Sequence, residues 1–223
     1  DSEHFSIFSL LQNQNVKNIE KIYITASGGP FIDLPKNKFN KIKLSDALRH
    51  PNWRMGKKIT VDSATLMNKV FEVIEAKNIF DLDYKKIDIL IHQKSYIHAV
   101  IKFKNGLTKI LAHDPDMKIP IFNSLYYNEN KIYKSNILDF DILNNLNFKK
   151  VDLKKFPLVK ILNHLSEQSS LYETILITIN DYLVLKFLKK RIGFKKLMDL
   201  IIKISNIKEF QKYKKIKPKK IKD

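Results

Sequence analysis

The sequence predicts an α+β domain, with a small mixed sheet and flanking helices, followed by an all-α helical bundle. Between positions 19 and 112, several segments are rich in β-branched residues and alternate apolar with polar positions. This pattern indicates strands. Between two of these segments, residues 62–75 have apolar residues at helical spacing, which predicts a helix. Beyond the strands only helical patterns remain, over residues 156–167, 170–190 and 193–206.

The same patterns set the expected domain boundaries. We expect the α+β domain to cover residues 1–128, with a loop at about 45–58 that closes over its binding site. The segment 129–152 is rich in Asn and Lys, and it is typical of a connection. The helical domain is expected over 153–223, and we find no internal repeat.

Composition is typical of a globular protein. The 223 residues, 44% of them hydrophobic, suffice for one large domain or two small ones with a real core. The absence of cysteine excludes disulfides and thiolate metal sites, and it suits a reducing compartment. No apolar run reaches about 18 residues and no signal-peptide pattern occurs, so we expect no membrane span. Because the chain starts at Asp1 rather than Met, we expect its natural beginning to be missing.

The formal net charge of +18 raises the question of nucleic acid. Lysine is spread along nearly the whole chain, which indicates a compositional bias rather than a basic face. The one dense cluster is the tail 212–222, and it lacks the interleaved aromatic residues of a single-strand platform. Nucleic acid is therefore not the expected main partner, and a polyanion-binding basic protein is kept as an alternative.

Acidic residues open the chain. Phe5, Phe8 and Leu11 recur at helical spacing, and Asp1 and Glu3 lie at the N-terminal edge of that helix. Two carboxylates at this spacing can bind a hard cation such as Mg²⁺ or Mn²⁺. They can equally form a plain helix cap.

A glycine pair follows the first strand, which is predicted over 19–26. Ser27, Gly28 and Gly29 come directly after it. Two glycines let the backbone approach a ligand closely, and their N–H groups can form an anion-binding nest. The alternative is a simple turn that ends the strand.

The loop after residue 48 contains the single tryptophan, Trp53, between His50 and Met55. Pro51 and Gly56 mark the segment as a loop. Because a large exposed ring is costly, Trp53 should cover either the core or a ligand. The loop is therefore a candidate lid, and in the alternative Trp53 packs the base of the loop.

The stretch 62–75 has a helix start signal at Asp62 and Ser63, so we expect Ser63 at a helix N-terminus that favours an anion. Asn68, Lys69 and Glu72 are spaced to share one face of that helix. Such a helix could serve a phosphorylated, metal-bound substrate. The alternative is an ordinary amphipathic helix with a solvated Lys–Glu pair.

Three further strands are predicted over 87–92, 97–103 and 107–112, the last two joined by a turn at Gly106. His98 lies among alternating apolar residues of the second strand. It is either a buried core histidine or a functional one.

The combination of motifs is more specific than any one of them. The succession DSEH, ASGGPF, RHPNWRMGKKITVDSATLMNKVFEVIEA, LIHQKSYIHAV and DPDMKIPI closely resembles the 1-deoxy-D-xylulose 5-phosphate reductoisomerase family. The resemblance covers residues 1 to about 122, and the helical remainder resembles the family only loosely. It implies conversion of 1-deoxy-D-xylulose 5-phosphate to 2-C-methyl-D-erythritol 4-phosphate in non-mevalonate isoprenoid biosynthesis. It also implies NADPH, a divalent metal (Mn²⁺, Mg²⁺ or Co²⁺), a homodimer, and a bacterial cytoplasm or a plastid-type organelle.

The resemblance also implies roles for individual residues. The metal ligands would be Asp1, Glu3 and Glu72. Catalytic roles fall to Glu3, His50, Lys69 and Glu72. The substrate would further contact Ser2, Ser27, Trp53, Ser63 and Asn68. The nicotinamide cofactor would lie near Met55, Gly56 and Met117, and His4 and His98 match histidines of the family site.

The chain departs from the family pattern in one important respect. The family has a dinucleotide-binding domain with a glycine-rich turn, but none of the five glycines here forms a G-x-G pair. We therefore expect a fragment, the catalytic and C-terminal parts of a longer enzyme, that alone neither binds NADPH tightly nor turns over. A non-catalytic remnant that binds a phosphosugar and metal is the alternative. Val70, Gln93 and Lys118 also replace usual family residues, but none of them is an expected ligand.

Overall fold

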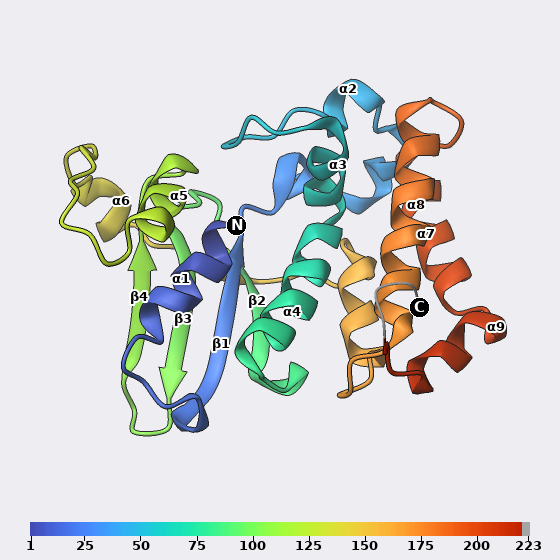
Figure 1. Ribbon diagram of the computed structural model, residues 1–223. Coiled ribbons are helices and arrows are strands. Elements are labelled where there is room, and N and C mark those ends of the chain that lie inside the picture. The colour runs from blue at the N-terminus through green and yellow to red at the C-terminus, as the bar shows by residue number, and fades with distance from the viewer. Residues whose placement is uncertain (220–223) are drawn as a thin grey trace. The chain divides into compact units, whose positions relative to one another are not determined.

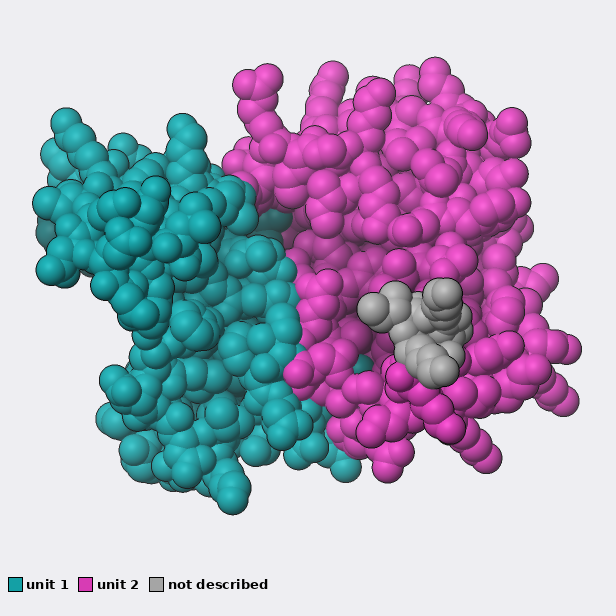
Figure 2. Space-filling view, in the orientation of Figure 1, with its two compact units in different colours: residues 1–27, 79–151 teal, residues 28–78, 152–223 magenta. Residues whose placement is uncertain are grey.

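The computed structural model describes residues 1–219, which form two compact units (Figures 1 and 2). Unit 1 contains residues 1–27 and 79–151, and unit 2 contains residues 28–78 together with the chain from 152 onward. This division differs from the expected boundaries. Residues 28–78 group with the C-terminal helices instead of the sheet, and 129–151 belong to the sheet unit.

Unit 1 is built on a mixed sheet. Among the described residues this sheet has five strands in the order β4-β3-β1-β2-β5, and Figure 1 labels the first four of them. The strands are β1 (Ile19–Ala26), β2 (Ile87–Ile91), β3 (Ile97–Phe103), β4 (Thr108–Ala112) and β5 (Lys149–Lys150). The pair β1–β2 is parallel, and the other neighbouring pairs are antiparallel. The expected α+β class with a small mixed sheet is confirmed.

Helices and short 3₁₀ turns surround this sheet. Helix α1 (Ser2–Leu10) packs on β3 and β4, and α5 (Lys118–Leu125) contacts α1. Side chains of and beside α6 (Phe140–Asn144) pack against buried residues at the start of β3. The 3₁₀ turns of this unit are Val16–Asn18 and Tyr84–Lys86. The connection expected over 129–152 thus contains a helix and an edge strand.

Unit 2 is helical. Its helices are α2 (Leu44–Ala47), α3 (Lys57–Thr65), α4 (Met67–Phe80, whose last two residues count with unit 1), α7 (Leu171–Leu188), α8 (Phe194–Ser205) and α9 (Lys208–Gln211). The 3₁₀ turns are Gly29–Phe31, Lys36–Lys41, Pro157–His164 and Lys212–Lys215. The segment 156–167, predicted as a helix, thus forms a 3₁₀ helix that ends at His164 instead of at residue 167.

Aromatic packing explains why residues 28–78 join the C-terminal helices. Phe31 and Phe194 make an edge contact with ring centroids 4.9 Å apart, and Phe39 lies 6.0 Å from Phe194. Helix α3 also packs on α7. Because these contacts bury large apolar side chains, they hold the two sequence-distant segments in one core.

The prediction that a helix begins at Asp62 is wrong. Leu66 has left-handed backbone angles, φ 60° and ψ 18°, and it ends α3 before α4 begins at Met67. Ser63 therefore lies in the last turns of α3, and Asn68 and Lys69 occupy the first turn of α4. The helix N-terminus in this stretch is that of α4 at Met67, so the expected position of Ser63 at a helix N-terminus is not found.

No helix within residues 1–219 is long and apolar enough to cross a membrane. The end of the lysine-rich tail and of the expected helical domain, residues 220–223, lies outside the described residues.

Candidate active site

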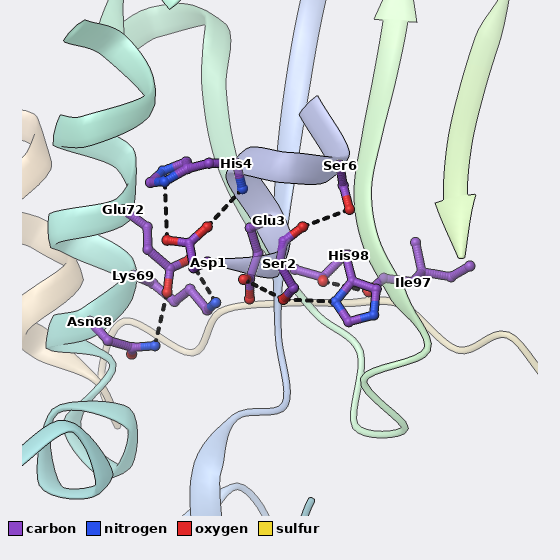
Figure 3. A network of polar contacts seen from close by, with 11 residues as sticks. Asp1, Ser2, Glu3, His4, Ser6, Asn68, Lys69, Glu72, Ile97 and His98 are labelled. Atoms are coloured by element: carbon purple, nitrogen blue, oxygen red, sulfur yellow. Dashed lines mark hydrogen bonds and ion pairs between the residues drawn. The ribbon is translucent and has the colours of Figure 1, made fainter. Parts of the chain in front are cut away.

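The first residue caps the first helix. One carboxylate oxygen of Asp1, Oδ1, accepts the backbone N–H of His4 at 2.7 Å, and the other, Oδ2, lies 3.0 Å from Nδ1 of the same histidine (Figure 3). The interpretation of Asp1 as a helix cap is thus confirmed. A cation can still reach its carboxylate, because the Asp1 side chain is 31% exposed.

Ser2 and Glu3 begin a buried polar chain. The Ser2 hydroxyl lies 2.7 Å from Oε2 of Glu3 and 3.0 Å from Nδ1 of His98 on β3 (Figure 3). Ser2 and His98 are almost fully buried, at 3% and 2% exposure. His98 is thus packed in the core and also hydrogen-bonded to a predicted site residue. The two interpretations of His98, as a core histidine and as a functional one, are therefore compatible.

The first turns of α4 bring three predicted site residues together. Lys69 Nζ lies 2.7 Å from Oε2 of Glu72, and Asn68 Nδ2 donates to Oε1 of Glu72 at 3.2 Å (Figure 3). Lys69 and Glu72 are both buried. The solvated Lys–Glu pair of an ordinary amphipathic helix is therefore excluded. Burying a carboxylate is costly unless its oxygens are paired, as both oxygens of Glu72 are here. This cost favours a functional reason for the buried position of Glu72.

His50 organises the loop that carries Trp53. Its Nδ1 accepts the backbone N–H groups of Asn52 at 3.1 Å and of Trp53 at 2.9 Å. Burial, and after it the positive charge of Lys69, lower the pKa of His50 to about 4. His50 is therefore neutral near pH 7, with its proton on Nε2.

The glycine pair lies against α3. Gly29 has φ +65°, and a Cβ atom added there would lie 2.9 Å from the carbonyl oxygen of Ser63. Gly28 also has a positive φ. The backbone thus approaches the segment carrying Ser63 more closely than any other residue type allows. Ser27, which directly follows β1, is buried.

A polar cluster joins α3 to α7. Asp62 is fully buried, accepts from Asn180 Nδ2 at 2.8 Å, and lies 2.9 Å from Lys58 Nζ. Lys58 also contacts Asp181 at 2.8 Å. Burial raises the pKa of Asp62, and the contacts with Asn180 and Lys58 oppose that rise. The cluster fixes the helix that directly follows the Trp53 loop.

The residues expected near a nicotinamide are accessible. Met55 and Gly56 end the loop in unit 2, and Met117 precedes α5 in unit 1. The two methionines are 36% and 37% exposed. Exposed thioethers can pack against a flat ring, so their chemistry fits the expected role.

The carboxylate oxygens of the candidate metal ligands fit a hard divalent cation. Asp1 and Glu3 belong to unit 1, and Glu72 belongs to unit 2. Carboxylates are the ligands that Mg²⁺ and Mn²⁺ prefer, and a softer metal would require sulfur ligands that a chain without cysteine cannot supply as thiolates.

Comparison with protein families finds two matches. A family model described as the 1-deoxy-D-xylulose 5-phosphate reductoisomerase C-terminal domain matches residues 1–80, and one described as the DXP reductoisomerase C-terminal domain matches residues 113–223. The chain is 59% identical over 221 residues to the 1-deoxy-D-xylulose 5-phosphate reductoisomerase of Pelagibacter ubique, covering 99% of this chain and 57% of that protein. The Sulfurihydrogenibium enzyme is 46% identical over 202 residues, covering 91% and 54%. The chain therefore spans about half the length of the curated relatives it matches.

Solved structures agree with these matches. A crystal structure of DOX-P reductoisomerase in complex with NADPH, fosmidomycin and magnesium superposes with a TM-score of 0.87 at 32% identity, covering 96% of this chain and 55% of that one. The Zymomonas mobilis enzyme in complex with NADPH gives the same TM-score at 30% identity, covering 100% and 56%. Sequence motifs, fold and relatives lead to one conclusion: the chain belongs to the 1-deoxy-D-xylulose 5-phosphate reductoisomerase family, of which it carries the C-terminal domains.

Proposed function

We propose that this chain provides the metal- and substrate-binding part of a 1-deoxy-D-xylulose 5-phosphate reductoisomerase. The reaction converts that phosphosugar to 2-C-methyl-D-erythritol 4-phosphate with NADPH and a divalent cation, in non-mevalonate isoprenoid biosynthesis. The observation that carries the proposal is the buried pair of Lys69 and Glu72 on α4, in a chain of this family. The ammonium suits a phosphate and the carboxylate suits a cation, so one helix turn offers the two charges that such a substrate needs.

On the metal side, Asp1, Glu3 and Glu72 would hold Mn²⁺ or Mg²⁺, and Co²⁺ fits the same donors. When bound, the cation polarises the substrate carbonyl and stabilises negative charge that develops on oxygen. Ser2 would contact the substrate beside it. The hydrogen bond from Ser2 to Glu3 supports this role, because it engages one carboxylate oxygen of a proposed metal ligand.

On the phosphate side, Ser27, Ser63, Asn68 and Lys69 would hold the phosphoryl group. The start of α4 supports this assignment, because Asn68 and Lys69 lie in its first turn and the positive end of a helix dipole favours an anion. Binding energy from the phosphate, which does not react, can close the loop of Trp53 and align the reacting carbons. Closure would also exclude water from the intermediate.

His50 would act as a hydrogen-bond donor. Because its Nδ1 accepts two backbone N–H groups of its own loop, the proton of the neutral ring lies on Nε2. The lowered pKa keeps the ring neutral near pH 7. His50 would thus hold the loop in shape through one nitrogen and donate to a substrate oxygen through the other.

The nicotinamide would lie near Met55, Gly56 and Met117. Because the chain contains no G-x-G pair, we expect that this chain alone neither binds NADPH tightly nor turns over. A saturable NADPH titration in the nanomolar to micromolar range would contradict that expectation. A homodimer and a bacterial cytoplasmic location belong to the same proposal, and the bacterial relatives support the location.

The test is a calorimetric titration of the chain with 1-deoxy-D-xylulose 5-phosphate or with fosmidomycin, in the presence of Mn²⁺. We expect saturable binding that requires the metal and weakens in the variant Lys69→Ala. The matched control is Lys102→Ala, which removes a surface lysine paired with Glu20 and should bind as the wild type does. Absence of metal-dependent binding in the wild-type chain would refute the proposal.

A further inference from the structure

Two histidine rings stack at the end of the sheet that lies beneath α1. The ring centroids of His98 and His113 are 3.7 Å apart, and the ring planes differ by 13°. His98 lies on β3 and is 2% exposed, and His113 follows β4 and is 9% exposed. The backbone N–H of His113 donates to the carbonyl of Tyr96 at 3.0 Å, so the pairing of β3 with β4, irregular at His98, brings the two rings together.

Backbone carbonyls fix the proton positions on both rings. His113 Nδ1 lies 2.6 Å from the carbonyl oxygen of Asp114, and His98 Nε2 lies 3.1 Å from the carbonyl oxygen of His113. Because a carbonyl oxygen only accepts, the ring nitrogen must donate in each case. The proton of His98 therefore lies on Nε2, and in the neutral ring Nδ1 presents a lone pair to the Ser2 hydroxyl.

The Ser2 hydroxyl consequently has two acceptors for one proton. Oε2 of Glu3 lies 2.7 Å from Ser2 Oγ, and Nδ1 of His98 lies 3.0 Å from it. When Oε2 of Glu3 is engaged elsewhere, the hydroxyl proton can turn to His98 without leaving a buried donor unpaired. His98 thus keeps Ser2 in place whether or not Glu3 accepts from it.

We propose that His113 is a positioning residue for the metal-side carboxylate. Its ring stack and its backbone carbonyl hold His98, His98 holds the Ser2 hydroxyl, and Ser2 orients Glu3. None of the motifs quoted for the family assigns a role to His113. The inference rests on the proposed function, because it assumes that Glu3 binds the cation.

Substitution of His113 tests the contribution of the ring stack to this series of contacts. Without the His113 ring, the His98 ring loses its stacking partner, which weakens the restraint that keeps Nδ1 towards Ser2. Both alanine and phenylalanine at position 113 keep the backbone carbonyl, but only phenylalanine keeps a flat ring. His113→Ala should therefore loosen His98, whereas His113→Phe should hold it as the wild type does.

Metal affinity measures the consequence directly. We expect Mn²⁺ binding, followed by electron paramagnetic resonance of the free ion, to weaken on the order of 10-fold to 100-fold in His113→Ala, as for other outer partners of metal ligands. His113→Phe should bind close to the wild type. The matched control is His92→Ala: His92 is also buried, contacts the carbonyl of Asn147 through Nδ1 and lies against Phe148, but no contact links it to Ser2 in the described chain.

Three results would overturn the inference. The first is unchanged Mn²⁺ affinity in His113→Ala beside a loss in Glu72→Gln. The second is an equal loss in His113→Ala and His92→Ala, because that would indicate general destabilisation. The third concerns the proton positions, read from long-range proton–nitrogen spectra of labelled protein. We expect His98 protonated on Nε2 and His113 on Nδ1, with the preference of His98 weakened in His113→Ala; the opposite tautomers, or an unchanged preference of His98 in that variant, would contradict the role.

If the wild-type chain and every variant fail to bind Mn²⁺, the proposed metal site fails. The tautomer spectra then still decide whether His113 orders His98. The two failures are therefore distinguishable.

Discussion

Lys69 Nζ lies 2.7 Å from Oε2 of Glu72, and the two side chains are only 6% and 11% exposed. The residue proposed to bind phosphate is thus paired with a residue proposed to bind the cation. Each charge neutralises the other, which keeps both buried at a tolerable cost. A cation on Glu72 would weaken this pair and leave Lys69 available for the phosphate.

We therefore expect the metal and the phosphorylated ligand to bind with positive coupling. Fosmidomycin should bind about tenfold more tightly with saturating Mn²⁺ than without it, within the usual range of coupling between two sites. Calorimetric titrations with and without Mn²⁺ measure the factor. By reciprocity, fosmidomycin should tighten Mn²⁺ binding by the same factor.

The variant Lys69→Gln serves as the control for this coupling, because its neutral amide cannot form the ion pair. The coupling factor should shrink in that variant, apart from any direct contact between metal and ligand. An equal factor in Lys69→Gln and the wild type would show that the ion pair does not carry the coupling.

His50 should make stability depend on pH. Burial, and secondarily Lys69, lower its pKa from 6.5 to about 4, so the unfolded chain binds a proton in this window that the folded chain does not. The free energy of unfolding should consequently fall as pH falls from 6.5 towards 4. Urea unfolding at about pH 7 and about pH 5 measures the fall. His50→Asn keeps a hydrogen-bond acceptor but does not titrate, so it should show a smaller fall; an equal one would exclude His50 as the source.

The contact between Asn180 and Asp62 should stabilise unit 2. Asn180→Ala leaves an oxygen of the fully buried Asp62 carboxylate without its donor, and we expect a loss of about 3 kcal/mol in the free energy of unfolding. The neighbouring Asp181 is the matched control, because its pair with Lys58 is half exposed, at 49% and 41%. Asp181→Asn should change stability by less than about 1 kcal/mol. Similar losses in both variants, measured by denaturant titration, would contradict this account.

Gly29 should be intolerant of a side chain for a reason that Gly106 does not share. Both have positive φ, +65° and +87°, but only at Gly29 would a Cβ atom meet other atoms, the Ser63 carbonyl oxygen at 2.9 Å among them. Gly106→Ala should cost about 1 kcal/mol of backbone strain. Gly29→Ala should cost more and also weaken fosmidomycin binding, because it displaces the segment that carries Ser63. Equal costs would show that the close approach is unimportant.

Local patterns predicted much of the fold. The alternation of IEKIYITA predicted a strand over 19–26, and β1 has those bounds. The helical pattern over 170–190 predicted the long helix, and α7 begins at Leu171, behind a capping box between Ser170 and Glu173. These features depend on neighbours within a few residues, so a single sequence contains the information.

Long-range packing accounts for what the sequence did not reveal. Nothing local indicates that Leu66 adopts left-handed angles, because this conformation is unfavourable for leucine and persists only when surrounding packing imposes it. Likewise, Phe31 meets Phe194 across more than half of the chain, so the division into units could not be read from sequence order. The stack of His113 on His98 depends on the pairing of β3 and β4. A histidine directly before the DPDM motif was the one available hint.

The most direct test of the account is the Mn²⁺ affinity of a set of carboxylate variants. If Glu3 and Glu72 bind one cation, Glu3→Gln and Glu72→Gln should each abolish saturable Mn²⁺ binding, and the double variant should lose no more than either alone. Glu20→Gln, a surface carboxylate paired with Lys102, should bind Mn²⁺ as the wild type does. Wild-type Mn²⁺ affinity in either Glu3→Gln or Glu72→Gln would contradict the shared metal site.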